Sequence, residues 1–421
     1  MWNCFVVLFP LFFGIDLTFS RISLETSTID FKHLLEEELS KDSGCKISLN
    51  KDLSLKQPLF LVPGTTRYFT PIINTTDLLF HEGELIELFC TRGFADSKAH
   101  SIVTSCNGND EFVYGDELYN ISQLSCKSPA FHVAIRTDER CFNNGTLVKI
   151  GFELDTRFLQ LYEVCFDEIV RRTHYVKHHL SPWNSRHQPT TRPYFIQGAF
   201  FPDTKISNLY TFETQKRTLG RILGSPERAD ALLDVKKDLF LARGHLAAKA
   251  DFFFSHHQRA SFWFINAAPQ WQKFNAVNWQ RVETGVRDLI ARRNMHVTVY
   301  TGTYGVLELA DANGDMKEIY LDFDPDGDDE GRVPVPKIYY KILHDEENDA
   351  GIVLVGVNNP HATLEEIEEG YIFCNDLSDR INWVQWKRDY IPGGYSYACD
   401  VNEFNAMTKH LPLPKISRLL V

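Results

Sequence analysis

Short apolar stretches separated by turn-forming residues fill the chain from residue 21 to about residue 181. Examples are 59–62, 85–90 and 131–135, and Gly, Asn, Asp and Ser cluster between them. This spacing is typical of short β-strands joined by tight turns. We therefore expect residues 21–181 to form a small β-rich module.

The rest of the chain, residues 190–421, alternates apolar runs with longer helical patterns. A helix is predicted over about 277–294, where apolar residues recur at helical spacing on one face. Strands are predicted at 238–242, 261–266, 296–301, 317–323, 338–343 and 352–357. The expected fold class is α/β (α+β), with a central mixed or antiparallel sheet. The polar, two-proline stretch 181–192 is interpreted as the linker between the two parts.

The first twenty residues have the features of a secretory signal peptide. An apolar run from Trp2 to Gly14 is followed by Thr18 and Ser20, small residues at the two positions that a signal peptidase inspects. Cleavage is expected after Ser20. No later segment offers the ~20 apolar residues that a bilayer span requires, so no membrane association is expected.

Cysteines and glycosylation sequons also indicate an extracellular protein. Without Cys4, the chain keeps eight cysteines, an even number that allows four disulfides. Six of them precede residue 170 and their pairing stays open, whereas Cys374 and Cys399 stand apart and are predicted to pair. N-x-S/T sequons predict glycosylation at three positions in an oxidising secretory route, namely Asn74, Asn120 and Asn144.

Charge is segregated along the chain, although the net charge is −12. Residues 181–294 hold 17 Lys and Arg against 9 Asp and Glu, a balance of +8, which leaves −20 on the remainder. A basic segment within an acidic chain fits a phosphate-binding cleft. On charge alone, basic residues on solvated helix faces explain it equally well.

Two segments contain residues suited to phosphodiester hydrolysis, which requires a general base, a divalent cation and cationic groups for the phosphoryl charge. His245 follows a predicted strand and stands behind Gly244, which lets the backbone turn, so it is placed to act as the base. Asn275 precedes the predicted helix. Its neutral amide oxygen suits Mg²⁺, which keeps several waters and needs few protein ligands.

Asn275, Trp279, Glu283 and Arg287 are each four residues apart. In a helix this spacing places them along one side, where they are expected to face the same cleft. Glu283 would then orient metal-bound water or pair with Arg287.

Two segments, ARGHLAAKADF and INAAPQWQKFNAVNWQRVE, closely resemble the DNA/RNA non-specific endonucleases of the ββα-metal superfamily, in particular secreted arthropod members of saliva and digestive fluids. The likeness covers roughly residues 190 to 410. Order and spacing both match: an Arg-Gly-His, an Asn, a second Asn nine residues on and a Glu eight beyond that.

The resemblance implies roles for residues of this chain. His245 would be the general base and Asn275 the Mg²⁺ ligand, with Mn²⁺ as a substitute metal. Arg243 and Asn266 would contact the phosphate or the transition state, and Glu283 would support the water shell of the metal.

Further arginines are implied as nucleic-acid contacts. Arg281 and Arg287 belong to the helix segment of the motif. The family also uses an arginine upstream of Arg-Gly-His, for which Arg217 and Arg221 are both candidates.

One position departs from the family pattern, which begins Asp-Arg-Gly-His, because this chain has Ala242 instead. The departure supports an alternative, a catalytically weakened extracellular protein that binds nucleic acid on the same scaffold. The intact His245, Asn275 and Glu283 favour an active enzyme.

The expected function is therefore that of a secreted Mg²⁺-dependent endonuclease. By resemblance, it would cut single- or double-stranded DNA and RNA without sequence preference and leave 5′-phosphates. Contacts to phosphate rather than to base edges would account for the absence of sequence preference.

Overall fold

The computed structural model describes residues 44–323, 331–409 and 411–421. The signal peptide expected at 1–20 lies outside the described residues. Within them, no helix is both long enough and apolar enough to cross a membrane.

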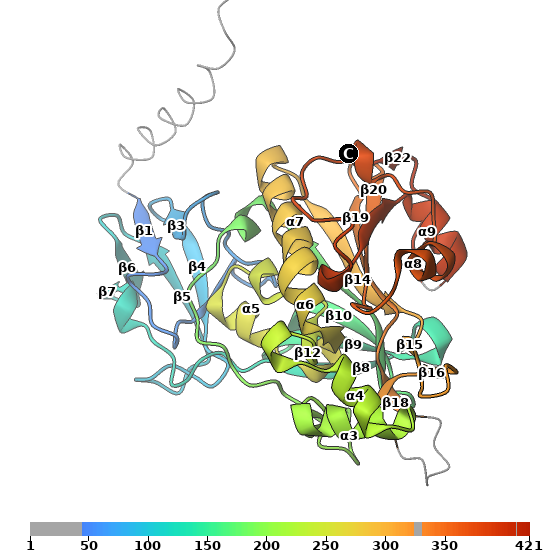
Figure 1. Ribbon diagram of the computed structural model, residues 1–421. Coiled ribbons are helices and arrows are strands. Elements are labelled where there is room, and N and C mark those ends of the chain that lie inside the picture. Colours follow the sequence, from blue (N-terminus) through green and yellow to red (C-terminus); the bar gives the residue numbers. More distant parts are fainter. Residues whose placement is uncertain (1–43, 324–330, 410) are drawn as a thin grey trace, which may run out of the picture.

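A nine-stranded sheet forms the centre of the molecule (Figure 1). Eight strands follow the order β21-β20-β19-β14-β11-β10-β9-β8 with antiparallel pairing, and β22 joins β20 in parallel. The predicted fold class is confirmed. The strands are β8 (Val133–Arg140), β9 (Thr146–Leu154), β10 (Arg157–Asp167), β11 (Arg172–Leu180), β14 (Val297–Tyr304), β19 (Ile338–Asp345), β20 (Ala350–Val357), β21 (Ser396–Cys399) and β22 (Arg418–Leu419).

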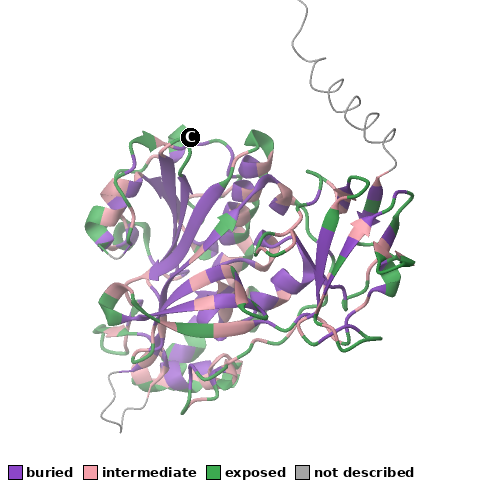
Figure 2. Ribbon diagram, turned by 180° about the vertical axis from the view of Figure 1, so that it is seen from behind, coloured by how far each residue is buried: buried purple, intermediate pink, exposed green. Residues whose placement is uncertain are grey.

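Both faces of this sheet are covered. Val299 and Leu354 pack on the same side as α7 (Gln280–Arg293), whereas their neighbours Tyr300 and Val353 pack on the side of α8 (Leu364–Gly370) and α9 (Val401–Thr408). Figure 2 shows the strands buried between these layers. Strands buried on both faces appear in the sequence as continuous apolar runs, which is why 338–343 and 352–357 were predictable.

The N-terminal module is a smaller β-structure beside α5 (Figure 1). Its disulfides are Cys45–Cys106 and Cys90–Cys126, and its core includes Phe253 and Phe254 from the α/β part. One of its sheets pairs β1 (Cys45–Ser48) with β3 (Asp77–Phe80), and the other has the order β2 (Leu59–Leu61), β4 (Leu85–Phe89), β5 (Ser101–Cys106), β6 (Glu111–Tyr114) and β7 (Glu117–Asn120).

The large sheet crosses the expected division at residue 181. Strands β8 to β11 precede that residue, yet β11 pairs antiparallel with β14, and Cys141–Cys165 lies among these early strands. The alternation of a strand identifies its two faces but not its partner strands, so the sequence placed β8 to β11 with the module.

The remaining elements include those that form the site described below. The predicted strand at 261–266 is instead a loop that ends in a 3-10 helix (Phe264–Asn266) before β13, and the one at 317–323 is two short strands, β16 and β17. The elements are α2 (Ile206–Leu209), α3 (Phe212–Ile222), α4 (Pro226–Leu232), β12 (Leu241–His245), α5 (Ser255–Ala260), β13 (Ala267–Trp271), α6 (Gln272–Phe274), a π-helical turn (Asn275–Trp279), β15 (Glu308–Ala310), β16 (Met316–Glu318), β17 (Tyr320–Asp322) and β18 (Arg332–Pro334).

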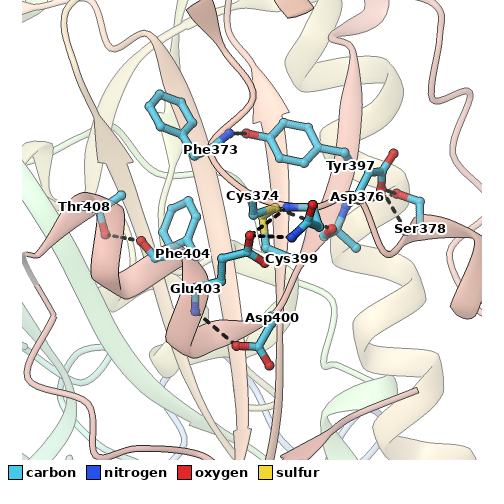
Figure 3. Close-up of a disulfide and its surroundings, with 12 residues drawn as sticks. Phe373, Cys374, Asp376, Ser378, Tyr397, Cys399, Asp400, Glu403, Phe404 and Thr408 are labelled. Carbon is cyan, nitrogen blue, oxygen red and sulfur yellow. Dashed lines mark hydrogen bonds between the residues drawn. A yellow bond between two sulfur atoms is a disulfide. The ribbon is translucent and has the colours of Figure 1, made fainter.

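The fourth disulfide joins Cys374 to Cys399, the pair expected from the sequence (Figure 3). It fastens the segment before residue 378 to β21. Around it, the backbone N–H of Phe373 donates to the Tyr397 hydroxyl (3.3 Å), and Asn375 donates to Glu403 of α9. The disulfide therefore holds an irregular segment against the sheet edge.

The three sequon asparagines, Asn74, Asn120 and Asn144, are all exposed. Asn74 and Asn144 have positive φ, as residues in tight turns often do. Their exposure makes each side chain accessible to modification.

Candidate active site

A strand pair and a helix bring the predicted site residues together. β12 runs antiparallel to β13, with His245 opposite Ala267 at the end of the pair. After β13 the chain passes through α6 and the π-helical turn into α7. His245 and Asn275, the first residue of the π-helical turn, both line one cavity.

This cavity has a volume of about 230 Å³ and collects groups from separate elements. Arg243, His245, Asn275 and Glu283, four of the residues predicted from the sequence, all line it. Its cations outnumber its carboxylates, so it favours an anionic ligand. The full lining is His187, Arg192, Arg243, His245, Ala248, Lys249, Ala250, Gln258, Phe262, Asn275 and Glu283.

The imidazole of His245 is held neutral by its surroundings. It packs against the rings of Phe195 and Phe262, with centroid distances of 4.9 and 4.8 Å. Burial, together with the nearby cationic Arg192, lowers the pKa of His245 to about 3. Its Nε2 is buried without a hydrogen-bond partner among the described residues. A neutral imidazole in this position is equipped to accept a proton.

Gly244 is required by packing. A Cβ at this position would lie 2.3 Å from Oε1 of Gln270 and 2.8 Å from the hydroxyl of Tyr339. Glycine therefore lets β12 approach the main sheet closely, whereas the sequence had indicated a backbone turn.

The side chain of Asn275 is suited to coordinate Mg²⁺. This half-buried side chain lines the cavity and makes no hydrogen bond to any described residue. The described residues contain no cluster of three or more His, Cys, Asp or Glu suited to a metal. Mg²⁺ often keeps most of its waters and takes few protein ligands, and a cavity of this size holds several waters. One amide oxygen plus water is therefore a donor set compatible with this ion.

Glu283 shares the cavity with Asn275. Burial and the neighbouring Asp251 raise the pKa of Glu283 to about 7, although Arg287 and Lys341 act in the opposite direction. Trp279, expected on the same side of the helix, instead packs against Phe274 and Tyr339 in the core. The π-helical turn changes the angular spacing, so only part of the predicted row of four faces the cavity.

Behind Glu283 lies a buried charge cluster that the sequence analysis missed. The carboxylate of Asp251 is 2.7 Å from Nη1 of Arg287, 3.1 Å from Nε2 of His178 and 3.9 Å from Nζ of Lys341. The positive charges of Lys341 and Arg287 and the hydrogen bond with His178 hold the pKa of Asp251 well below its usual range, against the effect of burial. The cluster ties α7 to β11 and β19. The available signal was Lys341, a charged residue inside an apolar strand.

Two arginines supply positive charge at the cavity. Arg243 donates from Nη2 to the backbone oxygen of Ser207 (3.2 Å), and its guanidinium lies 5.2 Å from the centroid of the Tyr210 ring. Arg192 is exposed, with its guanidinium 5.6 Å from the centroid of the Phe262 ring. Arg192 ends the segment interpreted as a linker, and its role was missed there.

Asn266 does not line the cavity, contrary to the expected phosphate contact. It is fully buried, and its amide accepts from the N–H of Ala247 (2.9 Å) and donates to the carbonyls of Ala247 (3.0 Å) and Ser261 (2.8 Å). Both amide N–H donors are already used by these two carbonyls. Asn266 thus fixes the loop that follows His245.

Four of the five predicted arginines also lie outside the cavity lining. Arg217 and Arg221 are exposed on α3, and Arg281 is half-exposed on α7. Arg192, which was not predicted, lies upstream of Arg243 in the sequence and lines the cavity. Arg287 instead belongs to the buried charge cluster behind Glu283, where it forms an ion pair with Asp251.

Comparisons with known proteins identify a family and several relatives to which this chain is similar. The profile of the DNA/RNA non-specific endonuclease family matches residues 143–404. A salivary endonuclease of Lutzomyia longipalpis is 30% identical over 381 residues, which cover 88% of this chain and 85% of the relative. Salivary protein Tsal2A of Glossina morsitans morsitans is 24% identical, covering 87% and 92% respectively. A solved EndoG/EndoGI complex overlaps 49% of this chain and 76% of its own, with 23% identity and a TM-score of 0.32.

Proposed function

Since the chain belongs to the DNA/RNA non-specific endonuclease family, we propose that it is a secreted, Mg²⁺-dependent enzyme that hydrolyses DNA and RNA to fragments with 5′-phosphates. The observation that carries the proposal is the shared cavity, in which a neutral histidine, an unpaired amide, a carboxyl group and cations meet. Four disulfides and the salivary relatives support secretion.

His245 is the proposed general base. Burial keeps its imidazole unprotonated at neutral pH, which is the form that a general base requires to accept the proton of the attacking water. The rings of Phe195 and Phe262 limit its rotation. The Asn266 clamp holds the following loop in place, which keeps His245 directed at the cavity.

Asn275 would hold Mg²⁺ through its amide oxygen, and Glu283 would accept hydrogen bonds from the surrounding waters. The metal, when bound, supplies Lewis-acid stabilisation of the phosphoryl charge and of the leaving 3′ oxygen. Arg243 adds a fixed guanidinium for the equatorial oxygens.

Substrate breadth follows from the kind of groups present. The cations Arg192, Arg243 and Lys249 bind phosphate, which DNA and RNA share, and they carry no sequence information. We expect single- and double-stranded forms of both to be cut.

The test is degradation of plasmid DNA, single-stranded RNA and long double-stranded RNA by the purified protein, with Mg²⁺, with Mn²⁺ and with EDTA. We expect cleavage with either metal and none with EDTA. End-labelling of the fragments with and without phosphatase would show 5′-phosphates. Binding of all three substrates without any cleavage would instead favour the nucleic-acid-binding protein that Ala242 allows.

A further inference from the structure

The chain from residue 187 to residue 196, here called the rim segment, borders the cavity and is fixed at both ends. Near its start, the buried Gln188 accepts from the N–H of Ser255 (3.0 Å) and donates to the carbonyl of Leu49 (2.9 Å) in the N-terminal module. At its end, the N–H of Ile196 donates to the carbonyl of Phe262 (2.8 Å). Residues between these anchors are therefore held against the site although they form no helix or strand.

Exposure alternates along the second half of the rim segment. Arg192 and Tyr194 are exposed, whereas Pro193 and Phe195 are half-buried. Phe195 packs on the His245 ring, and Arg192 lines the cavity. Tyr194 therefore lies on the outward side, two residues from a proposed phosphate contact and one from the partner of the base.

Tyr194 is far more exposed than a tyrosine needs to be. Its exposed fraction is 96%, against 41% for Tyr114 and Tyr390, the other exposed tyrosines of the described residues. Its ring makes no contact with another ring and its hydroxyl makes no hydrogen bond within the described part of the chain. Neither packing nor hydrogen bonding in the fold accounts for this aromatic side chain.

We propose that Tyr194 is a stacking platform for an unpaired base next to the phosphate held by Arg192, so that the rim segment forms a subsite for single-stranded nucleic acid. The proposal rests on the proposed function. An aromatic ring stacks on any base, because every base has a π-face, and beside a cation it binds a strand without reading its sequence.

The spacing of the two residues fits a strand. Two residues of extended chain span at most about 7 Å, which is about two base steps at ~3.4 Å per step along one strand. A strand whose phosphate contacts Arg192 thus brings a neighbouring base within reach of Tyr194. In a duplex the faces of that base are already covered by stacking, so the contact selects unpaired or distorted strands.

The experiment compares Tyr194→Ala, Tyr194→Leu and Tyr194→Trp on a single-stranded oligonucleotide and on its duplex. We expect the alanine and leucine variants to lose about tenfold in kcat/KM on the single strand, mainly through KM, and less than about twofold on the duplex. Tryptophan should restore the wild-type value. Tyr114→Ala, an exposed tyrosine of β6 in the N-terminal module, is the matched control and should leave both substrates unaffected.

A second readout does not depend on cleavage. When a single strand containing the fluorescent base 2-aminopurine is bound in EDTA, the wild-type protein should quench the 2-aminopurine fluorescence and Tyr194→Ala should not. Quenching without cleavage of any substrate would reject the proposed function and keep the stacking subsite. The subsite would be overturned if Tyr194→Ala lost kcat/KM equally on single strand and duplex, or if neither kcat/KM nor quenching changed. Cleavage by the wild-type protein would still support the proposed function in either case.

Discussion

Two asparagines nine residues apart, Asn266 and Asn275, have opposite surroundings. The side-chain amide of Asn266 hydrogen-bonds to the backbone of residues 247 and 261, whereas that of Asn275 faces the cavity without a hydrogen bond to the described residues. Hydrogen bonds of a fully buried amide stabilise the fold, and their loss leaves backbone groups unpaired. The first asparagine thus supports structure and the second is free to bind a ligand.

Replacing each asparagine by alanine separates these roles. We expect Asn266→Ala to lower the free energy of unfolding by about 2–4 kcal/mol, because three buried hydrogen bonds disappear. Asn275→Ala should change stability by less than about 0.5 kcal/mol and still abolish Mg²⁺-dependent cleavage. Urea unfolding and cleavage rates, measured on both variants, check this. If Asn266→Ala were as stable as wild type but cleaved slowly, the result would instead support the predicted phosphate contact of Asn266.

At this scale the sequence predicted what local spacing encodes. Arg243, His245, Asn275 and Glu283 were expected together and line one cavity. Arg192 and the Asp251 cluster were missed, because their partners lie on elements distant in sequence and the pattern of one segment does not reveal them.

Among the elements, the rim segment links the N-terminal module to the site. Gln188 exchanges hydrogen bonds with Gln57 at 2.9 and 3.0 Å and also binds Leu49, both in the module. Its backbone carbonyl accepts from Gln258 (2.8 Å), which itself lines the cavity. The module therefore helps to fix the segment that carries Arg192, although no residue of the module lines the cavity.

Gln188→Ala tests this link. Removal of the buried amide should cost about 1–3 kcal/mol, loosen the rim segment and raise KM more than it lowers kcat. Faster amide hydrogen exchange at residues 189–195 should accompany the change. Gln160→Ala, at an exposed position of β10, is the control and should alter neither quantity. Unchanged exchange and KM in Gln188→Ala would show that the module does not hold the rim.

Element types were more predictable than their assembly. The helix expected over 277–294 corresponds to the π-helical turn and α7, and strands at 296–301, 338–343 and 352–357 match β14, β19 and β20. The partners of β8 to β11 were not predictable, because period-two patterns leave strand pairing open. The π-helical turn also leaves no clear mark in a 3.6-residue pattern.

Considered as a whole, the molecule buries several neutral histidines between its two parts. Burial lowers the pKa of His132 to about 4 and of His256 to about 3. His132 accepts from Nε1 of Trp263 (3.0 Å), and His256 lies 3.3 Å from Nε2 of Gln57 in the module. Protonation of either ring would disturb this contact.

The fold should therefore lose stability in acid. As pH falls from about 6.5 towards 4, these histidines bind protons in the unfolded chain but stay neutral in the folded protein. Each histidine therefore lowers the free energy of unfolding by up to about 1.4 kcal/mol per pH unit. His256→Phe should show a shallower decline over this range. Denaturant unfolding at pH 7, 5.5 and 4.5 measures both slopes, and identical slopes would contradict the assignment.

Charge segregation leads to a prediction about salt. Arg192, Arg243 and Lys249 line the cavity of an otherwise acidic chain. For three phosphate contacts, the log of the affinity should fall against log salt with a slope of about −2 to −3, and Arg192→Ala should reduce the slope by about one. Fluorescence anisotropy with a labelled oligonucleotide in EDTA measures it. A flat response would exclude a basic binding cleft.

The most direct test of the central claim compares cleavage and binding in His245→Ala. We expect this variant to bind nucleic acid as wild type does and to cleave it at least about a hundredfold more slowly with Mg²⁺, because the general base is absent. His81→Ala, an exposed histidine of the module, is the control and should cleave normally. Equal cleavage by wild type and His245→Ala would contradict the account.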